Sequence, residues 1–115
     1  MSKRNWKLYI EDILECIEKI ERYIGDFQFD DFKNDSKTID AVVRNLEIIG
    51  EASRNIPEEI KNKYSEIPWR DIIDFRNRIA HEYFGISLSI AWYIIKQELP
   101  KLKQQIKQIL ESETK

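Results

Sequence analysis

The spacing of apolar residues is the feature that most constrains how this chain can fold. Aliphatic and aromatic residues recur every three or four positions along most of its 115 residues, and the chain holds only three glycines and three prolines. A repeat of this period places side chains on one stripe of an α-helix. We therefore expect helices almost throughout. The first stripe comprises Trp6, Tyr9, Ile10, Ile13, Ile17, Ile20 and Ile24.

Capping residues and helix breakers divide the helical pattern into segments. Gly25 is expected to end the first helix, and Asp35 or Ser36 to cap the second, whose stripe runs over residues 39–56. Residues 26–35 are expected to form a connecting loop whose phenylalanines dock onto the bundle. Short connections favour antiparallel neighbours, so the predicted fold is all-α, an antiparallel four- to five-helix bundle in one domain over residues 1–115. The later boundaries are expected at Pro57, Pro68, Gly85, Ser87 and Pro100.

Composition excludes several classes of protein. Nineteen Lys and Arg nearly balance 21 Asp and Glu, so any nucleic-acid site must be a local patch and not a strongly basic surface. The lone cysteine, Cys16, excludes an intrachain disulfide and a cysteine-cluster metal site, and is expected to be a small core residue. No apolar run is long enough to span a membrane, and the start lacks a secretory signal, so a cytoplasmic protein is expected.

The candidate chemistry narrows to one segment, residues 75–84. The sequence has no phosphate-binding glycine loop, no pair of histidines for zinc and no nucleophile elbow. On a helix starting at Trp69, Arg76 projects into the middle of the apolar stripe. An arginine there must be paired, line a cleft, or reach solvent through its long aliphatic stem. It is either salt-bridged to Glu47 or Glu51 of the second helix or part of a functional site.

The neighbours of Arg76 each have a structural and a functional interpretation. His81, the single histidine, either caps the end of the helix or takes part in proton transfer. Asn77 lies four residues before it and could orient the imidazole. Tyr83 shares the face of Arg76 and either completes the core stripe or lines the site. Arg78 projects elsewhere and is interpreted as a solvated charge or a contact to an RNA backbone.

The ordered set of motifs resembles that of the HEPN-domain ribonucleases, and more closely that of the HepT-like toxins. Arg76, Asn77, His81 and Tyr83 match the family signature Arg-Asn-x3-His-x-Tyr. The similarity covers nearly the whole chain, with no departure at these positions. The other matching segments are residues 9–14, 44–52, 67–70 and 75–85.

The resemblance implies a HEPN-type helical bundle, a homodimer and metal-independent RNA cleavage at a cleft between two subunits. Catalytic Arg76 and His81 and supporting Asn77 would form the site, without a metal or a cofactor. It also implies a toxin-antitoxin system in which a minimal nucleotidyltransferase antitoxin transfers AMP from ATP to Tyr83. The substrate would be an RNA such as a tRNA or an mRNA.

Two other classes of function compete with this interpretation. The first is a non-catalytic, dimeric helical module that binds a protein or a nucleotide, which the slightly acidic net charge of −2 favours. The second is the substrate-binding half of a split nucleotidyltransferase, although the chain lacks the paired aspartates of that chemistry. Cleavage of RNA separates the ribonuclease from both.

Overall fold

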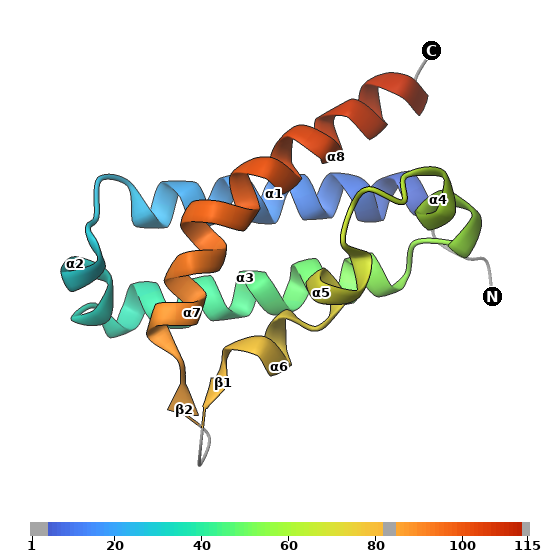
Figure 1. Cartoon of the computed structure of the whole chain (residues 1–115). Coiled ribbons are helices and arrows are strands. Elements are labelled where there is room, and N and C mark those ends of the chain that lie inside the picture. Colours follow the sequence, from blue (N-terminus) through green and yellow to red (C-terminus); the bar gives the residue numbers. More distant parts are fainter. Residues whose placement is uncertain (1–4, 82–84, 114–115) are drawn as a thin grey trace.

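Two long antiparallel helices form the centre of the molecule. The structure is a computed structural model that describes residues 5–81 and 85–113, except for the side chain of His81. Helices α1 (Trp6–Ile24) and α3 (Ser36–Arg54) lie side by side (Figure 1). Gly25, at a φ of 49°, ends α1, and the Asp35 side chain caps α3, as predicted. The stripe residues buried between them include Ile10, Ile13, Ile17, Ile20, Val42, Leu46 and Ile49.

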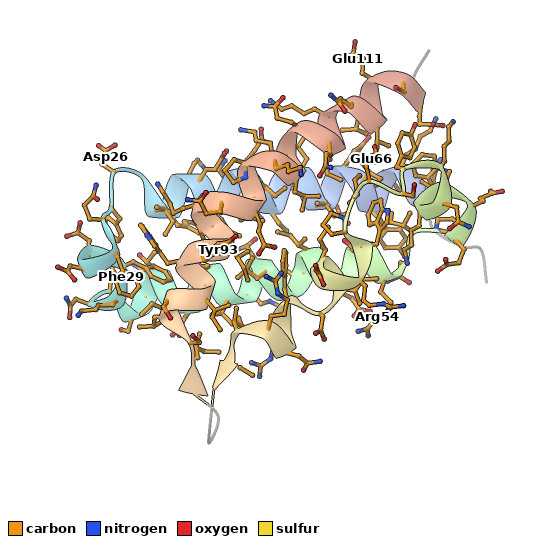
Figure 2. All side chains as sticks on the ribbon, in the orientation of Figure 1. Asp26, Phe29, Arg54, Glu66, Tyr93 and Glu111 are labelled. Atoms are coloured by element: carbon orange, nitrogen blue, oxygen red, sulfur yellow. The ribbon has the colours of Figure 1, made fainter. Side chains whose placement is uncertain are left out.

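The connection between these helices is not the plain loop that the sequence suggested. It contains a short helix, α2 (Phe29–Lys33), which begins where the backbone N–H of Gln28 donates to the Asp31 carboxylate at 2.8 Å. Phe32 is fully buried, and its ring lies 5.3 Å from that of Trp92. The expected docking of aromatic residues is confirmed, and Phe29 of α2 also contacts Trp92 (Figure 2).

Three short helices and two short strands follow α3. Helix α4 (Glu58–Lys63) starts after Pro57 and α5 (Trp69–Ile73) after Pro68, as predicted. The helix expected to reach Gly85 instead breaks at Asp74 and resumes as α6 (Phe75–Ile79). It then gives way to an antiparallel pair of two-residue strands, β1 (Ala80–His81) and β2 (Gly85–Ile86). Asp74 is the turn residue between the two helices, at φ −91° and ψ 9°, and its side chain accepts no capping hydrogen bond from the backbone of α6.

The rest of the chain is one continuous helical run. Ser87 caps α7 (Leu88–Tyr93), which passes through a π-helical turn, η2 (Ile94–Glu98), into α8 (Leu99–Glu113). The N–H of Leu99 donates to the carbonyl of Ile94, five residues back. Pro100 explains the wider turn, because its ring has no N–H for the carbonyl four residues before it and clashes there. The run changes direction at this turn and crosses α1 (Figure 1).

The buried side chains join into one core. The helices that build it confirm the all-α prediction. Each fully buried aliphatic side chain contributes about 1.5–3 kcal/mol to stability. Glu113 at the end of α8 accepts hydrogen bonds from Lys63 and Tyr64, which fastens α8 to α4. None of the helices in the described ranges is both long and apolar enough to cross a bilayer.

Candidate active site

Helix α6 is held against the core by two side chains. Phe75 is 1% exposed and Ile79 is fully buried, and the two lie four residues apart on the inner face. Arg76 and Asn77, between them, are exposed. The prediction that Arg76 lies within a buried stripe is therefore wrong. The projection assumed one straight helix, whereas the turn at Asp74 takes α6 out of register with α5.

The Arg76 guanidinium is paired with α3. Its Nε lies 3.6 Å from Oε1 of Glu47, and the two side chains are 60% and 36% exposed. Of the two partners considered from the sequence, Glu47 is the one observed, since Glu51 pairs with Arg54. A hollow of about 220 Å³ is lined by Leu46, Glu47, Gly50, Glu51, Arg54, Ile73 and Arg76. An ion pair this exposed is weak, so the guanidinium can exchange Glu47 for another anion.

Gly50 allows the close packing that forms the floor of this hollow. A Cβ atom at Gly50 would lie 3.1 Å from the carbonyl oxygen of Ile73 and 3.2 Å from that of Ile72. Both carbonyls belong to the last turn of α5, directly before the Asp74 turn. The absence of a side chain at Gly50 therefore sets how near α5, and α6 after it, can come to α3.

Asn77 has a local partner on the turn. Its Nδ2 donates to Oδ1 of Asp74 at 2.7 Å. This bond stabilises the entry to α6, a role that sequence reasoning did not identify for Asp74. The expected contact between Asn77 and the His81 imidazole falls on a side chain outside the described residues and stays a prediction.

Arg78 is not the solvated charge that the sequence suggested. Its two terminal nitrogens donate to both carboxylate oxygens of Glu98, Nη1 to Oε1 at 2.8 Å and Nη2 to Oε2 at 2.5 Å. Both side chains are 26% exposed. The hydrogen bonds to Glu98 are the main cause that raises the pKa of Arg78 above its usual value. Glu98 was missed because it is 20 residues away and no local pattern links the two.

The two strands carry the backbone away from α6. In the β1–β2 pair Ala80 lies opposite Ile86 and His81 opposite Gly85, and the N–H of Ser87 donates to the Ile79 carbonyl at 2.7 Å. His81 is therefore the second residue of the outward strand β1 that follows α6, and it does not lie in the last turn of a helix as the sequence suggested. Tyr83 lies outside the described residues.

The described residues contain no cluster of three or more His, Cys, Asp or Glu side chains that could hold a metal ion. The candidate site consists of an exposed guanidinium beside a hollow, followed by a short strand that ends at the single histidine. Such a set can bind an anion and exchange protons near neutral pH.

Comparison with known proteins identifies the family. The model of the family described as "Ribonuclease HepT-like" matches residues 13–109. This chain belongs to the HepT-like family. The match covers most of α1, all of α3 and the whole of α6, so it includes Glu47, Arg76 and His81.

Several known proteins are similar to this chain over most of its length. A probable ribonuclease HepT of Thermococcus cleftensis is 45% identical over 93% of this chain and 97% of its own length. A candidate RNase of Caldanaerobacter subterraneus is 46% identical over 91% of this chain and 94% of its own length. A gamma-glutamylcyclotransferase and candidate RNase of Methanocaldococcus jannaschii is 42% identical over 95% of this chain, which spans about half of that protein. No solved structure gives a significant match.

Proposed function

We propose that this HepT-like protein is a metal-independent endoribonuclease whose active site is completed by a second copy of the chain. Arg76 and His81 are its catalytic residues and Asn77 supports them. The observation that carries the proposal is the open Arg76 guanidinium, held by one weak ion pair beside a hollow and five residues before the single histidine. Membership of a family described as ribonucleases supplies the substrate class.

Cleavage without a metal uses the 2′-hydroxyl of the RNA as the nucleophile. A base removes the 2′-OH proton as the oxygen forms a bond to phosphorus, and an acid protonates the 5′-oxygen as its bond to phosphorus breaks. Imidazole can serve in either role because its pKa lies near neutrality. Arg76 would release Glu47 and hold the phosphate through its planar, doubly donating guanidinium.

The need for two proton-transfer groups favours a homodimer. One chain offers a single histidine, whereas a two-fold interface brings the same patch of both chains together. His81 and its symmetry mate would then divide the roles of base and acid. The cleft between the two subunits would hold the scissile phosphate beside Arg76.

The direct test is cleavage of RNA by purified variants in the presence of a chelator. We expect Arg76→Ala and His81→Ala each to lower the rate by at least about a hundredfold. Arg54→Ala is the matched control, because Arg54 is an equally exposed arginine of the same hollow whose partner is Glu51 (Figure 2). Parental rates in both variants would refute the assignment. They would favour the alternative, a non-catalytic dimeric interaction or nucleotide-binding module in which Arg76 is only a partner of Glu47.

The proposal extends to regulation of a cytoplasmic toxin. A minimal nucleotidyltransferase antitoxin would transfer AMP to the Tyr83 hydroxyl, which breaks the α–β phosphate bond of ATP and releases pyrophosphate. The added phosphate would lie two residues past His81 and offer Arg76 an anion in place of RNA. Inhibition would follow from this local block of the cleft.

Mass spectrometry after incubation with ATP and the partner enzyme tests this step. We expect an adenylate on the peptide that carries Tyr83, and its loss in Tyr83→Phe. Tyr93→Phe is the control, since Tyr93 is 54% exposed on α7 and would not change the modification (Figure 2). Modification found only at other residues would contradict the role of Tyr83.

A further inference from the structure

The Arg78–Glu98 pair joins the two ends of the segment that follows Arg76 and Asn77 and contains His81. Arg78 lies on α6 between Arg76 and His81, and Glu98 ends the π-helical turn η2. The chain between them contains β1, β2 and α7. The pair therefore closes a loop of the backbone around the strands at which His81 lies.

Helix α6 needs such a restraint. A helix of five residues has little stability of its own and depends on tertiary contacts for its orientation. Its two buried side chains, Phe75 and Ile79, lie on one face and set which side of α6 packs against the core. Arg78 supplies a contact on a different face.

The geometry of the pair suits a positioning role. Both oxygens of Glu98 accept from the planar guanidinium of Arg78, a doubly bonded arrangement that restrains direction as well as distance. Both side chains are more shielded from solvent than those of Arg76 and Glu47. The Arg78 guanidinium also lies over the Phe75 ring, 5.6 Å from its centre.

The π-helical turn η2 contributes to the position of Glu98, the second residue of the pair. A π turn holds one more residue than a regular turn, so it changes which side chains of a helical run face a neighbouring element. Glu98 is the last residue of this turn, two residues before Pro100. The position of its carboxylate thus depends on the irregularity that the proline imposes.

We propose that Arg78 and Glu98 are a positioning pair that fixes the rotation of α6, and with it the direction of the Arg76 guanidinium and the course of strand β1, which contains His81. This inference rests on the proposed ribonuclease function. Neither residue touches the substrate. Breaking the pair would misplace Arg76 and His81 relative to each other and slow the chemical step, while RNA would still bind.

The experiment compares Glu98→Gln, Arg78→Lys and the charge-swapped double variant Arg78→Glu, Glu98→Arg. We expect each single variant to lower kcat by about tenfold with KM changed less than twofold, and the swap to recover most of kcat. The matched control is Glu21→Gln, which breaks the 2.8 Å pair between Lys103 of α8 and Glu21 of α1 without touching α6. A folded Glu98→Gln protein with parental kcat would overturn the proposal, as would an equal loss of kcat in Glu21→Gln.

Amide hydrogen exchange gives a second measurement that does not depend on catalysis. We expect Glu98→Gln to accelerate exchange in residues 75–81 and 85–86 but not in α1, and Glu21→Gln to leave those residues unchanged. If the parent protein fails to cleave RNA, the proposed function is wrong. The positioning role of the Arg78–Glu98 pair is then tested by amide hydrogen exchange alone. Unchanged exchange in residues 75–81 would then refute its positioning role.

Discussion

At the scale of single residues, Glu47 and the RNA phosphate of the proposed reaction would compete for one guanidinium. Glu47 holds Arg76 in the free protein through a contact of 3.6 Å that is open to solvent. The phosphate of an RNA would need the same donors. Because exposed ion pairs contribute only about 0–1 kcal/mol, Glu47 can be displaced, yet its charge still opposes the incoming phosphate.

We therefore expect Glu47→Gln to favour substrate binding. Removing one negative charge beside Arg76 should lower KM for RNA by about two- to fivefold, with kcat changed less than twofold. Thermal unfolding should shift little, because the pair that is lost is a surface pair. Steady-state kinetics at fixed ionic strength measures the effect. A loss of activity as large as that of Arg76→Ala would instead mean that Glu47 takes part in the chemistry.

Features of the structure that depend on neighbouring residues could be predicted from the sequence, and features that depend on distant contacts or on a break in a helix could not. The caps Asp35 and Ser87 and the stop at Gly25 follow from neighbouring residues, and they were predicted correctly. The identity of the candidate residues came from a motif. The exposure of Arg76 could not be predicted, because it depends on a break at Asp74 that periodicity does not reveal.

At the scale of elements, the packing of α5 on α3 determines where the site lies. Gly50 permits contact between α3 and the last turn of α5, and α6 follows directly after the Asp74 turn. A side chain at Gly50 would meet backbone atoms, which cannot rotate away as a side chain can. Gly50 and the Arg78–Glu98 pair each join segments that are distant in the sequence. Their contacts could therefore not be predicted from local sequence patterns.

Gly50→Val tests this packing. A branched side chain would push α5 away from α3, and overpacking of this kind costs about 1–3 kcal/mol of unfolding free energy. The gain in helix propensity over glycine offsets part of that, at most about 1 kcal/mol. Chemical denaturation should show a net loss, and Ala52→Val, two residues along α3 and on nearly the opposite side of the helix, shows what a larger residue costs elsewhere on α3. Unchanged stability and activity in Gly50→Val would mean that this contact does not set the position of α6.

At the scale of the whole molecule, the fold places Arg76 on α6 and His81 on the strand that follows it, and one chain supplies only one histidine. The core between α1, α3 and α8 is built from aliphatic side chains, and α6 with the two strands lies at its edge (Figure 1). A site at an edge can meet the same site of a second copy. The proposed chemistry depends on a dimer formed through this edge, because the base and the acid must be separate groups.

The most direct measurement uses dimers that contain one parental chain and one His81→Ala chain. The two chains are co-expressed with different affinity tags and purified over both, so that every retained dimer is mixed. If His81 and its mate share the proton transfers, the mixed dimer cleaves RNA no faster than the His81→Ala homodimer. A mixed dimer with half of the parental activity, or a protein that yields no mixed dimer and is active as a monomer, would contradict the shared site.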